Sequence, residues 1–542
     1  MERTSGFDVI VVGSGSAGSV LAARLTEDPE CRVLLLEAGG SNRHPAVKMP
    51  AAFPKLFHTK RDWDLHGEPE ATVAGRRLYL PRGKMLGGSS SMNAMLYVRS
   101  RPQDHERWEA AGAEGWGWEE ALTYYLKSEN NERGASAYHA VGGPLNVRDP
   151  RSPRPLTARF LAACEAVGIP FTPDYNTGRQ DGAAIAQITQ KGGRRWSASD
   201  AFLTPAMSRP NLTVRTGALV TRVELTSGGV SAVRATGVRV RGRGGREELI
   251  EADQVVLAAG AFGSPQLLQL SGVGPAGVLR SAGVRTLVDS AGVGANLQDH
   301  PYATCIWDCL APESLYGADR PWSLLEWVLR GSGGLTSTAA EAFAFVRSRT
   351  GLDAPDLQYH FAPAYFWRHG SEEYEGDAFT VGPVLIAPAS RGSVTIRSAD
   401  PSAAPKIVTG TFTEPEDMAA MVTGVELARE LAASGPLEQV RGAELHPGEA
   451  LRSDESIERW IRENVELLYH PTGTVAIGSG DAPLDPELRV RGVDNLRVAD
   501  ASVFPTIPGG NTHAPTMMVA ERAADLIKGR ISARATQTTS AL

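Results

Sequence analysis

Cysteine is scarce in this chain, with only 4 among 542 residues. Such a number is too small for a disulfide framework. Cys305 and Cys309 lie close together, but no second pair and no histidine tract accompanies them, so we interpret them as ordinary reduced residues rather than metal ligands. The other two, Cys31 and Cys164, are isolated. We therefore predict neither a disulfide framework nor a metal site.

The chain also lacks an excess of positive charge and any long apolar run. Its net charge is −7, which gives no electrostatic case for nucleic acid or an anionic membrane as a partner. No stretch reaches the roughly 20 apolar residues of a membrane span. The first residues contain no basic segment followed by an apolar core and a cleavage site. We therefore expect a cytoplasmic protein with no membrane span.

Length and glycine content are the features that the chain does have. Its 542 residues exceed the roughly 100–200 residues of one ordinary domain, so we expect two or more domains, or one elaborated domain. Hydrophobic residues at 42% and charged residues at 22% are typical of a globular protein. The 58 glycines and 35 prolines follow no triplet period, which excludes collagen and favours an enzyme rich in loops.

A nucleotide-binding pattern occupies the first forty residues. An apolar run at 7–12 leads into Gly13-x-Gly15-x-x-Gly18, then a helical segment and a second apolar run that ends at Glu37. This order of strand, glycine turn, helix, strand and acid is the dinucleotide fingerprint. The turn lets backbone approach a pyrophosphate at a helix N-terminus, and Glu37 would accept hydrogen bonds from a ribose. The pattern disfavours NADP but does not choose between NAD and FAD.

A second glycine-rich stretch follows at 83–93. It combines adjacent glycines with three serines and Asn93. Such a loop would let backbone approach a flat ring and would supply donors to the polar edge of that ring. From composition alone, the alternative is a flexible surface loop.

Four motifs together carry a resemblance to a known family. They are Gly83-Lys84-x-Leu86-Gly87-Gly88-Ser89-Ser90-x-Met92-Asn93-x-x-x-Tyr97, Gly260-Ala261-x-x-Ser264-Pro265-x-Leu267-Leu268-x-x-Ser271-Gly272-Val273-Gly274, Gly294-x-Asn296-Leu297-Gln298-Asp299-His300 and Tyr469-His470-Pro471-x-Gly473-Thr474. With them the chain resembles, over nearly its whole length, the glucose–methanol–choline (GMC) flavin oxidoreductases. Within that family it is most similar to the choline dehydrogenase and choline oxidase branch.

The resemblance implies a mixed α/β fold of two domains. A Rossmann-like FAD-binding domain would be assembled from 1–147, 190–300 and 466–542. A substrate domain, with an antiparallel sheet and helices, would be inserted between these segments as 148–189 and 301–465.

The resemblance also implies FAD as the cofactor. Some members tether FAD through a histidine directly before the signature asparagine, and here that position is Met92, so we predict non-covalent FAD. An acid at the end of a late strand, here Asp500, would reach the ribityl and phosphate part. The residues assigned to the cofactor are Gly13, Gly15, Ser16, Gly18, Glu37, Gly88, Ser89, Asn93, Val220, Asp500 and His513.

The activity that the resemblance implies is oxidation of an alcohol to an aldehyde or ketone. The hydroxyl proton must leave, and a hydride must pass from carbon to flavin N5. A neutral imidazole suits the first event because its ordinary pKa lies near working pH. The family places its base at His470 and its second active-site residue at Asn511. His513 could line the flavin edge or take part in proton transfer.

The expected substrate pocket contains Glu341, His360 and Tyr469. In choline-oxidising relatives a carboxylate pairs with a quaternary ammonium, and Glu341 could do so, or it could be a hydrogen-bonded structural acid. The aromatic residues at 365–367 could cap the pocket or pack as strand residues.

Other functions stay open at this point. They are a non-redox GMC offshoot, such as a lyase or a photodecarboxylase, and a flavin-binding electron-transfer partner. The expected partners are a small-molecule alcohol and either O₂ or a quinone or similar carrier as electron acceptor, without nucleic acid. The identity of the alcohol and the oligomeric state cannot be read from the sequence.

Overall fold

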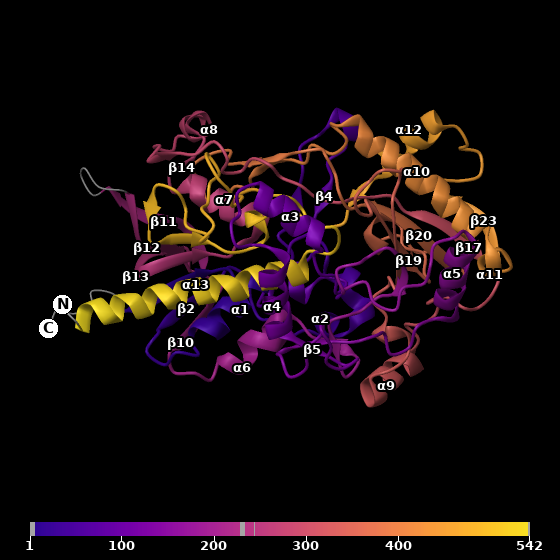
Figure 1. Ribbon diagram of the computed structural model, residues 1–542, viewed down its shortest axis with the longest axis horizontal. Helices are drawn as coiled ribbons and strands as arrows, with labels where there is room; N and C mark the ends of the chain where they lie inside the picture. The colour runs from indigo at the N-terminus through magenta and orange to yellow at the C-terminus, as the bar shows by residue number, and fades with distance from the viewer. Residues whose placement is uncertain (1–5, 228–232, 243, 540–542) are drawn as a thin grey trace.

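Two eight-stranded sheets organise the protein, as the computed structural model shows (Figure 1). The structure describes residues 6–227, 233–242 and 244–539. The helices are α1 (Ser16–Leu25), α2 (Pro45–Lys48), α3 (Pro102–Ala110), α4 (Trp118–Ser128), α5 (Pro155–Ala166), α6 (Thr204–Ala206), α7 (Gly260–Leu270), α8 (Ala276–Ser281), α9 (Pro321–Arg330), α10 (Pro415–Ala432), α11 (Gly435–Glu438), α12 (Asp454–Asn464) and α13 (His513–Thr539).

The first sheet has the order β10-β2-β1-β13-β12-β11, and in addition β25 pairs with β12 and β26 pairs with β13. Its strands are β1 (Phe7–Val12), β2 (Val33–Glu37), β10 (Leu212–Thr216), β11 (Leu219–Ser227), β12 (Val233–Arg241), β13 (Glu247–Leu257), β25 (Val493–Asp494) and β26 (Leu496–Val498). The pairs around β1 are parallel, and β2 is fully buried. Parallel strands that are covered on both faces have nearly continuous apolar sequences, and β1 and β2 both have such sequences.

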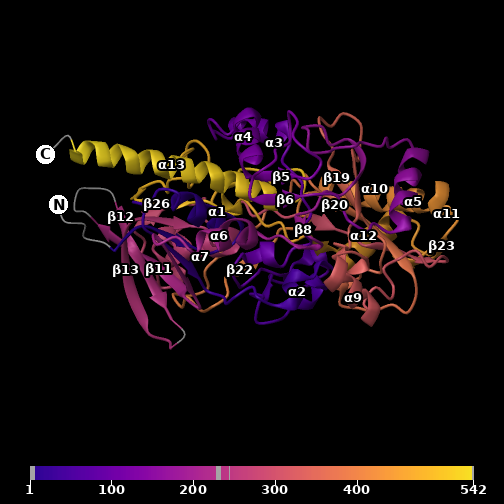
Figure 2. The ribbon, with the colours of Figure 1, turned by 90° about the horizontal axis from the view of Figure 1, so that it is seen from below.

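The helices α1 and α13 lie side by side against this sheet (Figures 1 and 2). The chain passes from β1 through α1 to β2, which pairs in parallel with β1. This βαβ unit puts the N-terminus of α1 at the carboxyl end of β1, where open α/β sheets bind nucleotides.

The second sheet is antiparallel, with the order β23-β17-β20-β19-β18-β7, and with β16 beside β20 and β24 beside β16. Its strands are β7 (Gly182–Ile185), β16 (Pro301–Tyr302), β17 (Cys305–Cys309), β18 (Ala342–Val346), β19 (Leu357–Ala362), β20 (Ala378–Leu385), β23 (Arg441–His446) and β24 (Glu466–Leu467). Helices α5 and α10 pack on it. The first sheet, which is mixed, and this antiparallel sheet together confirm the predicted mixed α/β fold class, while the exact domain boundaries stay a prediction.

Short strands complete the described elements. They are β3 (Leu65–His66), β4 (Tyr79–Leu80), β5 (Glu129–Asn131), β6 (Leu145–Val147), β8 (Gln190–Lys191), β9 (Arg194–Arg195), β14 (Val273–Gly274), β15 (Val288–Asp289), β21 (Ser393–Thr395) and β22 (Lys406–Val408). Among the described helices, none is both long and apolar enough to cross a membrane. The four cysteines are buried, and none of them forms a disulfide. The described residues contain no group of three or more potential metal ligands.

Candidate active site

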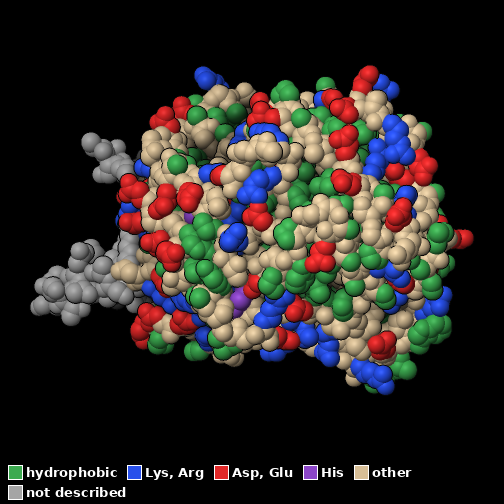
Figure 3. All heavy atoms as spheres, turned by 45° about the vertical axis from the view of Figure 1, so that its right-hand side comes forward, with side chains coloured by type: hydrophobic (Ala, Val, Ile, Leu, Met, Phe, Trp, Pro, Cys, Tyr) green, Lys and Arg blue, Asp and Glu red, His purple; other side chains and the backbone are tan. Residues whose placement is uncertain are grey.

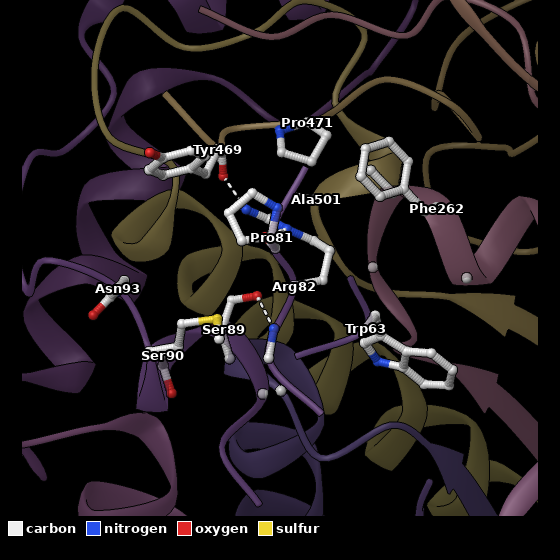
Figure 4. Close-up of a pocket in the computed structure, with 18 of the residues that line it drawn as sticks. Trp63, Pro81, Arg82, Ser89, Ser90, Asn93, Phe262, Tyr469, Pro471 and Ala501 are labelled. Carbon is white, nitrogen blue, oxygen red and sulfur yellow. Dashed lines mark hydrogen bonds between the residues drawn. The ribbon is translucent and has the colours of Figure 1, made fainter. Parts of the chain in front are cut away.

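A cavity of about 550 Å³ draws its walls from both sheets and from the loops between them. Most of the residues that the sequence analysis assigned to a site line it. These are Gly13, Gly15, Ser16, Glu37, Gly88, Ser89, Asn93, Val220, His360, Tyr469, His470, Asp500, Asn511 and His513. Gly18 and Glu341 are outside this lining. Figure 4 shows side chains from the loop at 81–93 facing those at 469–501 across the cavity.

The glycine turn forms one end of the cavity. A Cβ at Gly18 would lie 1.8 Å from the Gly13 carbonyl oxygen, so Gly18 lets α1 close onto the turn rather than face the cavity. A Cβ at Gly15 would meet nothing within 4 Å, because this residue borders open space. Gly15 is also the N-cap of α1, and no side chain caps the helix. The first turn of α1 therefore offers free N–H groups and its partial positive charge to an anionic group.

The second glycine-rich stretch lies against the first. A Cβ at Gly88 would come within 2.7 Å of the Gly15 Cα, so only glycine allows this contact. Ser89 Oγ accepts a hydrogen bond from the Gly83 backbone N–H at 3.1 Å (Figure 4). Met92 is buried and lines the cavity. The 83–93 stretch is thus a fixed wall, and the interpretation as a flexible surface loop is wrong.

Glu37 already has several protein partners. Its Oε2 accepts hydrogen bonds from the Ser14 backbone N–H at 3.0 Å and the Ser14 hydroxyl at 2.7 Å. Its Oε1 accepts from the Gly39 backbone N–H at 2.7 Å. Burial raises the pKa of the Glu37 carboxyl, and these hydrogen bonds oppose that shift. The carboxylate therefore ties the glycine turn to the end of β2, in addition to bordering the cavity.

Asp500 is held in a similar way. Its Oδ1 accepts from the backbone N–H and hydroxyl of Ser502 at 2.8 and 2.6 Å. Its Oδ2 accepts from the Gly260 backbone N–H at 2.8 Å and from the Ser264 hydroxyl at 2.6 Å. Burial raises its pKa, against the effect of these donors. Asp500 thus joins the end of β26 to the start of α7 and fixes the floor of the cavity.

His470 and Asn511 meet at the other end of the cavity. The His470 Nε2 lies 3.2 Å from the Asn511 Nδ2, although 41 positions separate the two residues in the chain. Both side chains are buried. The pKa of His470 is lowered well below 6.5, chiefly by burial and then by His300, His360 and Arg82. The imidazole is therefore neutral at physiological pH.

Sequence reasoning missed two residues that support His470. Its Nδ1 lies 3.0 Å from the Nδ1 of His300. The Asp299 Oδ1 accepts hydrogen bonds from the backbone N–H groups of His470, at 2.7 Å, and of His300, at 2.8 Å. The Asp299 carboxyl has its pKa raised to about 7 by burial, with Arg82 acting the other way. Both residues belong to the motif at 294–300, but that motif does not predict that they contact His470.

His513 lies on the side of the glycine turn. Its Nδ1 is 2.9 Å from the Ser16 hydroxyl, and burial, followed by the charge of Arg195, lowers its pKa to about 4. Its Nε2 is buried without a hydrogen-bond partner in the described structure. This contact with Ser16 favours the interpretation of His513 as a cofactor-side residue over a role in proton transfer.

The expected substrate residues do not all lie in the cavity wall. His360, on β19, lines the cavity, and burial lowers its pKa to about 3. Tyr469 also lines it, and the Tyr469 hydroxyl lies 2.5 Å from the His369 Nδ1. Among the aromatic residues at 365–367, Phe366 lines the cavity, whereas Trp367 stacks on His446 at 3.7 Å between ring centroids.

Glu341 is occupied elsewhere. Its Oε2 accepts hydrogen bonds from the Thr157 hydroxyl and the Arg154 backbone N–H, both at 2.7 Å. Its Oε1 accepts from the Ser337 hydroxyl at 2.7 Å. The carboxylate therefore binds the start of α5, which favours the alternative of a structural acid over a partner for a cationic substrate.

Two family models match the chain. Residues 7–302 match the N-terminal and residues 388–520 the C-terminal model described as GMC oxidoreductase. An oxygen-dependent choline dehydrogenase of Rhizobium etli is 42% identical over 533 residues, which cover 96% of each chain. An uncharacterized GMC-type oxidoreductase of Mycobacterium tuberculosis is also 42% identical, over 96% of this chain and 99% of the other.

Solved structures share the architecture as well. Pyridoxine 4-oxidase from Mesorbium loti superimposes with a TM-score of 0.87 at 33% identity, over 96% of this chain and 99% of that one. A formate oxidase variant from Aspergillus oryzae RIB40, studied for FAD modification, gives a TM-score of 0.92 at 28% identity, over 98% and 99% of the two chains.

Proposed function

Because this chain belongs to the GMC oxidoreductase family, we propose that His470 is the base with which it oxidises a small alcohol to an aldehyde or ketone. The family consists of FAD-binding oxidoreductases that act on alcohol donors. The observation that carries the proposal is the pair of His470 Nε2 and Asn511 Nδ2, 3.2 Å apart in the wall of the cavity.

The cavity fits FAD at the end formed by the glycine turn. The open space beside Gly15, the uncapped first turn of α1 and the unpartnered Nε2 of His513 all suit a large polar ligand. We propose that Gly13–Ser16 hold the phosphates, that Glu37 accepts from the ribose, and that Ser89 and Asn93 face the ring. FAD, when bound, supplies the acceptor for the hydride that leaves the alcohol carbon.

We propose that this FAD is held without a covalent bond. Met92 occupies the position of the tethering histidine, and a thioether carries no proton to exchange for a bond to the flavin. Acid denaturation followed by centrifugation tests this point. Yellow colour in the supernatant is the expected result, and colour that stays with the precipitated protein would contradict it.

Asn511 and His470 would divide the work on the hydroxyl group. An alcohol that enters between them can accept a hydrogen bond from the Asn511 Nδ2 and donate its own proton to the His470 Nε2. The amide cannot titrate, so it orients the alcohol, while the imidazole takes the proton as the hydride departs. General-base catalysis of this kind contributes roughly 10²–10⁴ in rate.

His300 supports the assignment of His470 Nε2 as the base. If the Asn511 amide donates to Nε2, the proton of the neutral imidazole lies on Nδ1 and is donated to the His300 Nδ1, 3.0 Å away. The His300 Nδ1 then accepts, so the proton of the neutral His300 ring lies on Nε2, which is buried without a hydrogen-bond partner among the described residues. We assign these tautomers from the hydrogen-bond network. In them, the lone pair of the His470 Nε2 accepts from Asn511, and it is this lone pair that can take the hydroxyl proton when an alcohol enters.

The cavity favours an uncharged alcohol. Among the described lining residues the acids are Glu37 and Asp500, and both belong to the cofactor end and are engaged by backbone and serine donors. Glu341 is bound to α5. The remaining wall near His470 includes Phe366 and Tyr302. No carboxylate of the described lining is therefore placed to neutralise a quaternary ammonium.

An anaerobic panel of alcohols tests the function. The panel should contain choline and its uncharged isostere 3,3-dimethylbutan-1-ol, together with primary and secondary aliphatic and aromatic alcohols. We expect uncharged alcohols to bleach the oxidised flavin spectrum and the isostere to outperform choline. Because oxygen-dependent dehydrogenases and oxidases are among the similar proteins, we propose O₂ as the acceptor, and admission of air should restore the spectrum. No bleaching by any alcohol would contradict the proposed reaction.

A further inference from the structure

Helix α9 turns an apolar face toward solvent. Its five exposed apolar side chains have exposed fractions between 45% and 72%, and they are Trp322, Leu324, Leu325, Val328 and Leu329. Spacings of three and four residues put such side chains on one side of a helix. Both ribbon views place α9 at the outer edge of the molecule (Figures 1 and 2). A surface helix normally turns its polar side chains toward solvent, so this exposed apolar face indicates a contact site for an apolar partner.

The helix is firmly seated on its other side. The buried Trp327 donates from its indole Nε1 to the Gly193 carbonyl oxygen at 2.8 Å. Glu326 accepts from the Ser332 hydroxyl at 2.9 Å. Gly331 ends the helix with a positive φ of 59°, and its backbone N–H donates to the Trp327 carbonyl oxygen. The apolar face is therefore a fixed feature of the surface.

Basic side chains surround the apolar face. Arg320 and Arg330 flank the two ends of α9, and both are exposed. The β8–β9 hairpin beneath the helix adds the exposed Arg194, whose guanidinium lies 5.1 Å from the Trp327 ring centroid. Lys191 of the same hairpin lies over the Trp196 ring instead, and the one exposed acid directly before the helix is Asp319, next to Arg320. An apolar helix face with tryptophan, leucine and a basic rim is the pattern of a helix that lies in the interface of a bilayer.

We propose that α9 docks this protein onto an anionic lipid bilayer. Trp322, Leu325 and Leu329 enter the headgroup region, and the basic rim contacts the anionic headgroups. The net charge of −7 does not oppose this, because it is spread over the chain. Over the face drawn in Figure 3, acidic and basic side chains are intermixed rather than gathered by sign, so the composition around α9 decides the local attraction.

A second copy of the chain fits this surface less well. A twofold contact would bring the same patch against itself, so the arginines beside α9 would approach the like charges of the second copy. The helix has 10 residues and is about 15 Å long, which is small for an interface that needs roughly 800 Å² from each partner. A bilayer accepts the same face without either difficulty.

Docking through α9 would bring the wall of the cavity close to the membrane. The chain continues from α9 through a 3₁₀ turn at Gly334–Thr336 to Thr338 and Ala340, which line the cavity. That turn packs on the 3₁₀ segment Pro50–Leu56, whose Phe53 also lines the cavity. A reactant dissolved in the bilayer would therefore reach the site by a short path. The docking itself does not depend on the proposed function.

Vesicle flotation with the full-length, FAD-loaded protein tests the proposal. The vesicles are phosphatidylcholine alone or phosphatidylcholine mixed with phosphatidylglycerol. We expect the protein to float with the mixed vesicles and to bind the neutral ones more weakly. The double variant Leu325→Glu/Leu329→Glu should lose at least about tenfold in binding to both. Arg320→Glu/Arg330→Glu leaves the apolar face intact and should weaken binding to the anionic vesicles selectively.

The matched control is Met207→Glu/Leu249→Glu, which alters two exposed apolar residues outside α9 and should float like the wild type. Flavin absorbance and melting temperature report on folding, and the arginine variant keeps the test valid if the leucine variant fails to fold. Failure of the wild type to float, or an equal loss in the control, would overturn the proposal. It would also be overturned if the wild type is a dimer that fails to float and that Leu325→Glu/Leu329→Glu converts to a monomer.

Discussion

Two groups of buried histidines in this protein carry opposite shifts in pKa. At and just behind the cavity wall, burial lowers the pKa of His300 and His360 to about 3 and that of His470 well below 6.5. Outside it, His139 lies between Glu129, at 3.1 Å, and Asp174, at 2.5 Å. Burial alone would lower its pKa, but these two carboxylates raise it to about 9.

The difference teaches that burial does not by itself decide the charge of an imidazole. A carboxylate partner offsets the free-energy cost of burying the cationic imidazole, and His139 has two such partners. The His470 ring has another imidazole and an amide as hydrogen-bond neighbours, whereas the Asp299 carboxylate binds the backbone N–H of His470 and not its ring. The first arrangement makes a structural cation, and the second keeps a base in its neutral form.

The largest effect should come from removing the neutral imidazole. His470→Ala should retain the fold and FAD but slow flavin reduction by roughly 10²–10⁴, because it removes the imidazole that lies beside Asn511 in the cavity wall. Stopped-flow reduction by a good alcohol measures this. The exposed His66→Ala is the matched control and should react like the wild type. A His470→Ala rate within about threefold of the wild type would remove His470 from the mechanism.

The amide beside it should have a smaller effect of a different kind. Asn511→Ala removes a group that orients the alcohol but carries no titrating proton. We expect flavin reduction to slow by roughly 10- to 100-fold, within the range that positioning contributes, with little change in its pH dependence. A pH profile that shifts by a whole unit or more would show that Asn511 controls a titrating group.

The buried carboxylates at the cofactor end of the cavity show the same competition between burial and hydrogen bonds. Glu37→Ala removes the acceptor for three protein hydrogen bonds and the acceptor proposed for the ribose. FAD affinity should fall by at least about tenfold, and the melting temperature of the apoprotein should fall as well. The exposed Glu30→Ala is the control. Unchanged affinity together with a lower melting temperature would assign Glu37 to the turn alone.

The smallest effect should appear in stability at high pH. The pKa of His139 is raised from 6.5 to about 9 in the folded protein. Its contribution to the free energy of unfolding is therefore complete below pH 6.5 and is lost as the pH rises through 9. We expect a wild-type melting temperature that falls over this range more steeply than that of His139→Gln. Parallel curves for the two proteins would mean that His139 is not a buried cation.

Local patterns made some of these features predictable from the sequence. The segment from β1 to β2 follows the dinucleotide fingerprint, and Gly18 is required by a contact with Gly13 inside that unit, although Gly13 itself packs against Ala258 after β13. His470 and Asn511 were found only through family motifs, since 41 residues separate them and no local rule brings them together.

Other features depend on contacts that no local pattern encodes. The Nδ1 atoms of His300 and His470 meet across 170 positions. Glu341 binds Thr157 at the start of α5, 184 positions away, so its exclusion from the cavity could not be read from neighbouring residues. The exposed face of α9 is also invisible to a count of net charge or to a search for long apolar runs, because only the fold shows which side of an amphipathic helix faces outward.

The pH dependence of anaerobic flavin reduction tests the central claim most directly. His470 should remain unprotonated as the pH falls through 6.5, because its pKa is lowered. The account predicts that the second-order rate constant for reduction by an uncharged alcohol stays level through this range and falls only at a pH well below 6.5. An acid limb centred at or above 6.5 that disappears in His470→Ala would contradict the account, because it would show that His470 titrates as an ordinary, solvated histidine.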